Sequence, residues 1–355
     1  MNAAGLRSSG RRVNTMNQPK LDTEPVRIVI VSPTLADANN GNWQTAQRWR
    51  ALLAPHKVRI VKQWPDAEAQ KKGAAQDQVM LALHARRSAT SVTAWAARQP
   101  TGAQGLAVVL TGTDLYRDIQ SDPTAQQSLA LAAQLVVLQA SGPDALPADL
   151  RAKTRVIFQS SAALPAVSKP STQAHLRVVM VGHLRDEKSP QTLFAAARLL
   201  LGEPKLFIDH LGEALDPALG DAARATAEAC PNYRWLGGQP YNATRRHIQR
   251  AHVLVHASLM EGGAHVVMEA ILSGTPVLAS RIPGNLGLLG DDYAGYFKPG
   301  DANGLAQLLR RCRGVSGDAW LAKLSAQCAM RAPLFSPELE RAALLKLVND
   351  LSIAS

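Results

Sequence analysis

The sequence predicts two α/β domains, each built on a parallel sheet, and three observations support this fold class. At 355 residues the chain is too long for one ordinary core and suits two domains of roughly 150 residues each. Short apolar runs alternate with amphipathic segments through most of the chain. This alternation stops once, in the segment 160–175, which is rich in Ser, Pro and Ala and is typical of an interdomain linker.

In the first half, five apolar runs rich in β-branched residues predict buried strands. They are residues 26–31, 79–84, 106–110, 135–139 and 155–159. Helical spacing of apolar residues predicts helices at 42–54, 87–98 and 123–133. Continuous apolar strands that alternate with helices form parallel sheets covered on both faces, so we expect a Rossmann-like domain over residues 25–165.

The same pattern restarts after the linker. Strands are predicted at 176–182, 205–212, 233–237, 252–258 and 276–280, with helices at 190–201, 217–229 and 242–250. Three further helices are predicted at 301–312, 318–330 and 336–352. We therefore expect a second Rossmann-like domain over residues 172–332, a cleft between the domains, and a C-terminal helix within 336–355 that packs back on the first domain.

Residues 1–24 are predicted to be a disordered leader. The first 20 residues contain four basic side chains, no acidic side chain and no apolar core of the secretory type. A transit peptide is the alternative, and Met16 is an alternative start. No apolar run reaches the roughly 18–20 residues of a spanning helix, so we expect a cytoplasmic protein that does not enter a membrane.

The net charge of +11 favours an anionic ligand. Four of these charges lie in the first 20 residues, which leaves seven on the rest of the chain. A nucleic-acid partner is supported by the charge alone. Only 5% of the residues are aromatic and the sequence has no nucleic-acid-binding motif, so a small anionic ligand is favoured. Three cysteines without a CxxC pair and nine histidines without a metal-binding spacing predict no disulfide framework and no metal site.

Two glutamates flank a glycine pair in the run EGGAHVVMEA, residues 261–270. The run follows a predicted strand, and ligands of doubly wound sheets lie beyond the carboxyl ends of the strands. A helix start near Ala264 would attract phosphate, whereas Glu261 and Glu269 would repel phosphate and accept hydrogen bonds from a vicinal diol. A ligand with both a diphosphate and diols is a nucleotide sugar. The alternative is a loop-to-helix junction whose glutamates face solvent.

Two other loops at strand ends carry candidate ligand-binding residues. In VGHLRDEKSP, Arg185 and Lys188 follow Gly182 and would neutralise a leaving diphosphate, with a solvated charge run as the alternative. In Asn39-Asn40-Gly41-Asn42, after the first strand, a glycine favours close approach of donor phosphate or acceptor, and helix capping is the alternative. The loop lacks the GxGxxG fingerprint, which excludes a dinucleotide site of that type.

A further group of polar residues follows two strands of the first domain. Its basic members are His84, Arg86, Arg87 and Arg117. An unpaired surplus of positive charge opposite the donor would suit an anionic acceptor. A closed ion-pair network with Asp114 and Asp118 is the structural alternative.

These motifs resemble family 4 of the glycosyltransferases, whose members have the two-domain GT-B fold. The runs GHLRDEK and EGGAHVVMEAILSGTPVLAS carry the resemblance, and similarity extends over residues 26–330. The E-x7-E motif of the family matches Glu261 and Glu269. The resemblance implies that Glu269 binds the nucleotide ribose, that Glu261 lies by the donor sugar, and that Arg185 and Lys188 contact the diphosphate.

The chain departs from the broad family at three places. GGAHVV replaces a stretch that usually contains a bulky residue and a proline, and Thr111 stands where a histidine often precedes a Gly-Thr/Ser-Asp turn. The basic residue that usually follows the strand-end glycine is His183 here, and Arg185 comes two positions later. These departures lie where members of the broad family have their donor-sugar contacts and their histidine base, so the resemblance does not assign those residues here.

Six blocks resemble one branch of this family more closely, the selenosugar synthases of selenoneine biosynthesis. The blocks are GNWQTAQRW, ALHARRSATS, LTGTDLYRDI, GHLRDEK, MEGGAHVVMEA and ASRIPGNLGLLGDDYAGYF. The resemblance implies a UDP-sugar donor, commonly UDP-N-acetylglucosamine or UDP-glucose, and selenophosphate as the nucleophile. A 1-seleno-sugar would form with release of UDP and phosphate. Because selenium in selenophosphate is already anionic, the reaction would need little help from a base.

The candidate residues fall into three groups. The catalytic group is Arg185, Lys188 and Glu261, and the UDP-sugar group is Gly41, Asn42, Gly182, Gly262, Gly263, Ala264, His265 and Glu269. The acceptor group is His84, Arg86, Arg87, Thr113, Asp114 and Arg117. No metal or other cofactor is expected. The alternatives are an ordinary sugar or lipid acceptor and a GT-B epimerase acting on the same nucleotide.

Overall fold

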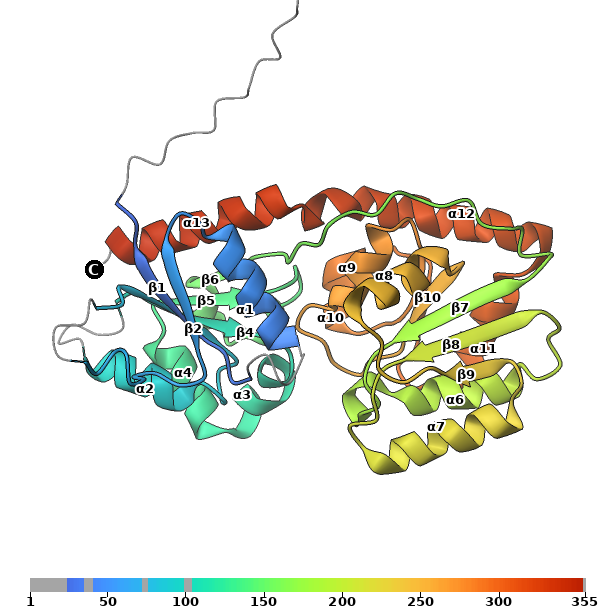
Figure 1. The fold of residues 1–355 in the computed structure, drawn as a ribbon, viewed down its shortest axis with the longest axis horizontal. Coiled ribbons are helices and arrows are strands. Elements are labelled where there is room, and N and C mark those ends of the chain that lie inside the picture. The colour runs from blue at the N-terminus through green and yellow to red at the C-terminus, as the bar shows by residue number, and fades with distance from the viewer. Residues whose placement is uncertain (1–23, 35–40, 72–75, 99–103, 354–355) are drawn as a thin grey trace, which may run out of the picture.

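Two six-stranded parallel sheets form the centre of the molecule and confirm the predicted fold class (Figure 1). The computed structural model describes residues 24–34, 41–71, 76–98 and 104–353, so all but the last residue of the predicted leader lies outside the described residues. The strand order is β2-β1-β3-β4-β5-β6 in the N-terminal sheet and β12-β11-β10-β7-β8-β9 in the C-terminal sheet. Every strand pair in both sheets is parallel.

The N-terminal domain alternates strands and helices from residue 27 to residue 156. Its strands are β1 Arg27–Val31, β2 Lys57–Val61, β3 Val79–Leu83, β4 Leu106–Leu110, β5 Gln134–Val137 and β6 Thr154–Val156. Its helices are α1 Gly41–Leu52, α2 Ala89–Ala97, α3 Ile119–Ser121, α4 Pro123–Leu131 and α5 Ala148–Arg151, with a short π-helix η2 Asp114–Asp118 and a 3-10 turn η3 Pro143–Ala145. The sequence analysis missed β2, because this half-exposed edge strand alternates polar and apolar residues over a short run.

The C-terminal domain repeats this plan. Its strands are β7 Leu176–Val181, β8 Leu206–Leu211, β9 Tyr233–Trp235, β10 Val253–His256, β11 Val277–Ser280 and β12 Tyr296–Phe297. Its helices are α6 Pro190–Leu199, α7 Pro217–Ala229, α8 Tyr241–Arg250, α9 His265–Ile271, α10 Pro283–Leu289, α11 Ala302–Arg311 and α12 Gly314–Arg331. The 3-10 turns η4 Asp186–Lys188 and η5 Ala332–Phe335 and the last helix, α13 Pro337–Ile353, complete the fold.

Aspartate caps define where three of the helices begin. Asp122 accepts hydrogen bonds from two backbone N–H groups of α4, and Asp216 and Asp301 do the same for one N–H group each of α7 and α11. A proline at the first position of α4 and α7 adds a φ angle that suits a helix and has no N–H group to leave unpaired. These caps explain why the predicted helix starts lie close to the observed ones.

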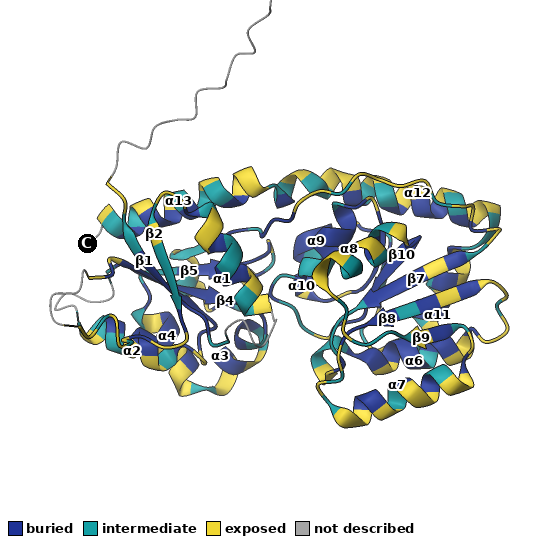
Figure 2. Ribbon diagram, viewed as in Figure 1, coloured by how far each residue is buried: buried dark blue, intermediate teal, exposed yellow. Residues whose placement is uncertain are grey.

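The C-terminal helix α13 crosses back to the N-terminal domain and packs against α1 (Figure 1). Leu344, Leu347 and Leu351 of α13 are buried in the same apolar cluster as Trp49 of α1 and the inner strands (Figure 2). Each fully buried leucine contributes about 1.5–3 kcal/mol, so this face holds α13 firmly on the first domain.

The carboxyl ends of both sheets meet at the junction of the domains. Strand order reverses between β1 and β3 in one sheet and between β7 and β10 in the other, and ligands of doubly wound sheets bind at such reversals. A Cβ atom on Gly112, after β4, would lie 2.9 Å from the backbone nitrogen of Gly262, after β10. The loops at the two sets of strand ends are therefore in direct contact. Within the described residues, no helix has the length and apolar content to cross a membrane.

His210 of β8 is an acid-sensitive element of the C-terminal core. Burial lowers its pKa to about 4, although a backbone hydrogen bond at Gly182 acts in the opposite direction. Its Nδ1 lies 3.0 Å from the hydroxyl of Tyr233. Because the unfolded state takes up a proton near pH 6.5 and the folded state only near pH 4, folding loses stability as the pH falls between these values.

Urea unfolding at pH 7 and pH 4.5 measures this effect. His210→Asn is expected to reduce the stability lost between the two pH values by roughly 2–3 kcal/mol relative to the wild type. An equal loss in wild type and His210→Asn would contradict the assignment.

Candidate active site at the domain junction

Lys188, Glu261 and His256 form a compact charged cluster at the ends of β7 and β10. Lys188 Nζ lies 2.5 Å from Glu261 Oε1, and His256 Nε2 lies 3.3 Å from the same oxygen. Burial opposes ionisation of Glu261, but Lys188 and His256 outweigh it and hold the carboxyl pKa well below its ordinary value. Glu261 is therefore an ionised carboxylate, and Lys188 is a cation held in place beside it.

Local backbone geometry brings Lys188 to this position. Its aliphatic stem lies over Gly182, because a Cβ atom there would be 3.5 Å from Lys188 Cγ and Cδ. Ser189 follows with φ 48° and ψ 53°, a left-handed conformation that turns the chain into α6 at Pro190. His84 has a similar φ of 73° at the end of β3 in the other domain. Left-handed residues other than glycine are uncommon and cluster at functional sites.

The Gly262–Gly263 turn packs directly against the N-terminal domain. A Cβ atom on Gly262 would overlap the backbone of Thr111, and one on Gly263 would lie 2.9 Å from Leu138 Cβ. Both glycines are therefore required by close approach between the domains. The turn ends at Ala264, and α9 begins at His265, as expected to within one residue. Because α9 has only seven residues, its N-terminus adds little to the predicted attraction of phosphate.

Glu269, the second glutamate of the motif, has different partners from Glu261. It is 5% exposed, with His265 Nδ1 at 3.5 Å and Arg245 Nη1 at 4.0 Å from its Oε1. Arg245 is itself buried and donates to Ser161 Oγ and the Ala162 carbonyl of the linker. The two glutamates of the motif are thus held by separate sets of cations.

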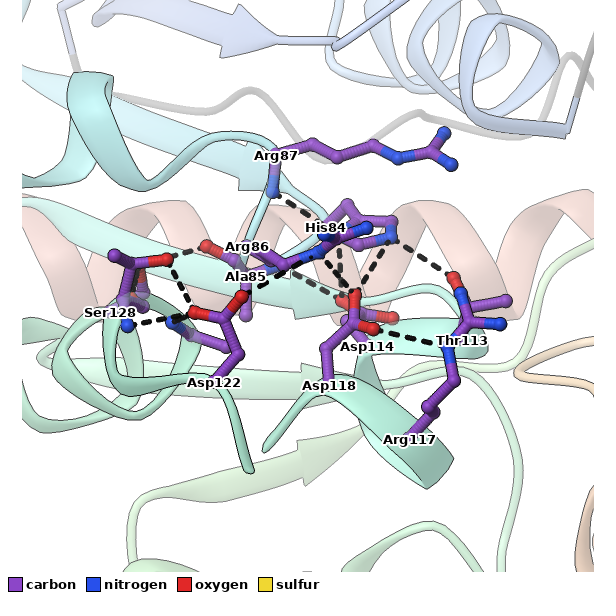
Figure 3. A network of polar contacts seen from close by, with 12 residues as sticks. His84, Ala85, Arg86, Arg87, Thr113, Asp114, Arg117, Asp118, Asp122 and Ser128 are labelled. Carbon is purple, nitrogen blue, oxygen red and sulfur yellow. Dashed lines mark hydrogen bonds and ion pairs between the residues drawn. The ribbon is translucent and has the colours of Figure 1, made fainter. Parts of the chain in front are cut away.

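In the N-terminal domain, Asp114 organises two loops at once. Its carboxylate accepts hydrogen bonds from the backbone N–H groups of Ala85, Thr111 and Gly112 (Figure 3). His84 lies beside it, with Nε2 3.0 Å from Thr113 Oγ1 and Nδ1 3.9 Å from Asp114 Oδ2. Asp114 therefore positions backbone rather than presenting a free carboxylate to a ligand.

The predicted surplus of positive charge is largely paired. Arg86 and Arg117 both lie within ion-pair distance of Asp118, at 2.9 Å and 3.2 Å. Arg87 is the exception: its side chain extends away from the aspartates, and no carboxylate of the described residues lies within ion-pair distance of it (Figure 3). Burial lowers the pKa of His84, and Arg87 adds to this effect, although Asp114 and Asp118 oppose it.

Arg117 also connects the two domains. Its Nη1 lies 3.4 Å from Glu187 Oε1 of η4, and Arg117 and Arg185 line one hollow of about 400 Å³. Leu215, Leu259 and Met260 supply its apolar wall. One residue of the predicted acceptor group and one of the predicted diphosphate pair are thereby brought together.

Gly41 and His183, two other predicted site residues, make contacts within their own domains. Gly41 is the first residue of α1, where its carbonyl accepts from Thr45 Oγ1, and Asn42 follows in the same helix. Asn39 and Asn40 lie outside the described residues. His183 accepts a hydrogen bond from the Glu213 N–H group at Nδ1, so it is engaged with the neighbouring loop.

Sequence reasoning missed four side chains of this region. They are His256, Arg245, Arg48 and Glu340. His256 ends β10 as His84 follows β3, so a histidine at the strand end was the available signal. Arg48 and Glu340 are 292 positions apart and gave no local signal. Within the part of the chain that the structure describes, no three His, Cys, Asp or Glu side chains come together as a metal site would require.

The glycine contact between the domains can be tested by adding one methyl group. Gly262→Ala is expected to force the Thr111 loop away, lower the free energy of unfolding by about 1–3 kcal/mol and raise the radius of gyration in small-angle scattering. Gly202→Ala, where a Cβ meets no atom within 4 Å, is the matched control. A Gly262→Ala protein with wild-type stability and dimensions would show that the contact is not tight.

Comparison with known proteins gives a family match for part of the chain. Residues 168–312 match the family described as glycosyl transferases group 1. The glycosyltransferase 1 domain-containing protein 1 of Xenopus tropicalis is 29% identical over 126 residues, which are 35% of this chain and 36% of that protein. This chain therefore aligns with only about a third of that curated relative's length.

Solved structures resemble the chain over nearly its whole length. The sucrose-phosphate synthase of Thermosynechococcus elongatus has a TM-score of 0.71 and 19% identity, covering 93% of this chain and all of that chain. Anabaena HepE in complex with UDP has a TM-score of 0.70 and 15% identity, covering 92% of this chain and all of that chain. The chain thus has the GT-B fold, and residues 168–312 within it match the group 1 glycosyltransferase family.

Proposed function

We propose that the protein is a glycosyltransferase that moves a sugar from a UDP-sugar to selenophosphate. The bond between the sugar anomeric carbon and the UDP oxygen breaks, and a bond from that carbon to selenium forms. Water then cleaves the selenium–phosphorus bond, so that the products are a 1-seleno-sugar, UDP and phosphate. The activity of a glycosyltransferase is the broader part of this proposal, and the selenium acceptor is the narrower part.

The observation that carries the proposal is the cluster of Lys188, Glu261 and His256 at the strand reversal of the C-terminal sheet. UDP gains negative charge as it leaves, and cations already held in position stabilise that charge at little reorganisation cost. In the free protein Glu261 neutralises Lys188. A bound donor would present its diphosphate to Lys188 and its sugar hydroxyls to Glu261, so both partners of the pair would find new contacts.

Uridine nucleotides are supported as donors by solved relatives. Anabaena HepE has been solved with UDP, with UDP and glucose, and with UDP-glucose, at 15–16% identity to this chain. Pneumococcal GtfA, an O-GlcNAc transferase, has been solved with UDP and GlcNAc. Both donor sugars implied by the sequence resemblance therefore occur among proteins of this fold.

Arg87 suits a small anionic acceptor. No carboxylate lies within ion-pair distance of it among the described residues, whereas Arg117 is paired with Asp118 and Glu187. Selenophosphate carries its negative charge on selenium as well as oxygen, so it can attack without transferring a proton to a base. Two of the six sequence blocks shared with selenosugar synthases, ALHARRSATS and LTGTDLYRDI, contain Arg87 and Arg117 respectively.

A hydroxyl acceptor is the second candidate, and His84 favours it. Its ring nitrogens lie 3.9 Å from Asp114 and 3.8 Å from Asp118, an arrangement that can orient a histidine for proton abstraction. The lowered pKa keeps His84 neutral at pH 7, as a general base requires. The apolar wall of the hollow would also accept a sugar or lipid body.

Mass spectrometry of reaction mixtures separates these candidates. Purified protein is incubated with a panel of UDP-sugars, each with selenophosphate or with sugar and lipid alcohols. The proposal expects UDP release and a product with the isotope pattern of selenium only when selenophosphate is present. Lys188→Met should lower kcat by about a hundredfold or more, because it removes a cation from the leaving group. Glycoside products with selenophosphate omitted would instead establish the hydroxyl-acceptor reaction.

Arg87 tests the acceptor site separately from the donor site. Arg87→Ala is expected to raise the KM for selenophosphate about tenfold or more and to leave the KM for the UDP-sugar nearly unchanged, because a charge-assisted contact to the acceptor is lost. Lys62→Ala, which removes an exposed cation of the same domain, is the control. Equal effects on both substrates, or no effect, would contradict an acceptor role for Arg87.

A further inference from the structure

A chain of four polar side chains leads from the C-terminal helix to the second glutamate of the motif. Its members are Glu340 of α13, Arg48 of α1, and His265 and Glu269 of α9. The four residues lie on three helices, and two of these helices, α1 and α13, pack together on the N-terminal domain (Figure 1). The chain therefore crosses from one domain to the other beside Glu269.

Glu340 is the fixed end of this chain. It is 1% exposed, and its two carboxylate oxygens accept from Trp49 Nε1 at 2.7 Å, from Ser160 N at 2.7 Å and from Ser160 Oγ at 2.5 Å. Arg48 Nε donates to both oxygens, at 3.0 Å and 3.2 Å. A buried carboxylate with this many donors holds the guanidinium of Arg48 in one place.

Arg48 in turn decides which nitrogen of His265 carries the proton. Arg48 Nη1 lies 2.6 Å from His265 Nε2, and a guanidinium can only donate hydrogen bonds. Nε2 must therefore be the lone-pair nitrogen, which leaves the proton on Nδ1. His265 Nδ1 lies 3.5 Å from Glu269 Oε1, one helical turn away on the same face of α9. The ring thus presents an N–H group to the carboxylate instead of a repelling lone pair.

We infer that Arg48 is a positioning residue that acts through His265 to orient the Glu269 carboxylate for the ribose hydroxyls of the donor. This inference rests on the proposed use of a UDP-sugar and adds a residue of the opposite domain to the ribose site. Arg245 Nη1 lies 4.0 Å from Glu269 Oε1, the same oxygen that His265 approaches. Without the His265 N–H group, the carboxylate can therefore rotate toward Arg245. The Glu269 carboxylate is then oriented for the ribose only when Arg48 contacts His265 of α9.

The prediction concerns the discrimination between ribose and deoxyribose, measured by titration calorimetry with UDP, 2′-deoxy-UDP and 3′-deoxy-UDP on the full chain. Wild type should bind UDP about tenfold to a hundredfold more tightly than at least one deoxy analogue, as expected for a hydroxyl that donates to a carboxylate. Glu269→Ala should bring this ratio close to one. Arg48→Met should lower the ratio toward that of Glu269→Ala, and Glu340→Gln should lower it by a smaller factor.

Arg50→Met is the matched control, because Arg50 is an exposed arginine of the same helix, and its ratio should equal that of wild type. A merely structural role for Arg48 predicts that UDP and the deoxy analogues weaken by the same factor in Arg48→Met, which would overturn the inference. An unchanged ratio and unchanged affinities would overturn it as well. If Arg48→Met does not fold by circular dichroism, Arg48→Lys replaces it, since one ammonium cannot contact Glu340 and His265 with the same geometry.

The outcomes for wild type separate this inference from the proposed function. If wild type binds no UDP, the proposed donor is wrong and the inference fails with it. If wild type binds UDP but does not discriminate the deoxy analogues, Glu269 does not contact the ribose. The inference is then overturned, whereas the UDP-sugar donor remains supported.

Discussion

The close contact between two backbone turns, Thr111–Gly112 and Gly262–Gly263, sets the geometry of the whole candidate site. Side chains on either turn would keep the domains apart, since Cβ atoms on Gly112 or Gly262 would meet the backbone of the opposite turn. Each turn follows a strand that ends at the junction, so the contact brings both sets of strand ends together. Arg117, which follows β4, then lies within ion-pair distance of Glu187, which follows β7.

Charge at this junction is held mostly in pairs. Lys188 is paired with Glu261, and Arg86 and Arg117 share Asp118. Lys188 and Glu261 form the more enclosed pair, with side chains 17% and 12% exposed, whereas Arg86 and Arg117 are 42% and 49% exposed. These ion pairs place the side chains before any ligand arrives. Such an arrangement suits transfer from an anionic donor, because the dipoles and charges need little reorganisation during the reaction. It also explains why composition alone overstates the free positive charge of the site.

The order of strands and helices could be read from the sequence because buried parallel strands and capped helices leave local patterns. The edge strand β2 was missed because it is half exposed and alternates in polarity. The rule that ligands bind at strand ends predicted that Lys188 and Glu261 lie at one site, and they are in contact although they are 73 positions apart. No local pattern predicts that Arg48 of α1 meets Glu340 of α13, because this contact depends on how the last helix packs across the first domain. The ion pairs of Asp118 with Arg86 and Arg117 correspond to the closed network that the sequence left open as an alternative.

The two chain crossings between the domains lie near Glu269, the carboxylate that we propose for the ribose of the donor. On the linker, Ser160 is bound by Glu340 of α13, which packs on the N-terminal domain, while the next residue, Ser161, is bound by Arg245 of the C-terminal domain. Further along, Leu164 N donates to the Leu272 carbonyl, so the linker is already fixed to the C-terminal domain there. The second crossing passes through the 3-10 turn η5. A rotation between the domains must therefore be taken up at Ser160–Ser161 and η5. Two arginines from opposite domains lie beside this pivot. Arg245 contacts Glu269 directly, and Arg48 contacts it through His265. A pivot placed beside the carboxylate changes its surroundings with even a small rotation, whereas Lys188 and Glu261 belong to one domain and keep their distance.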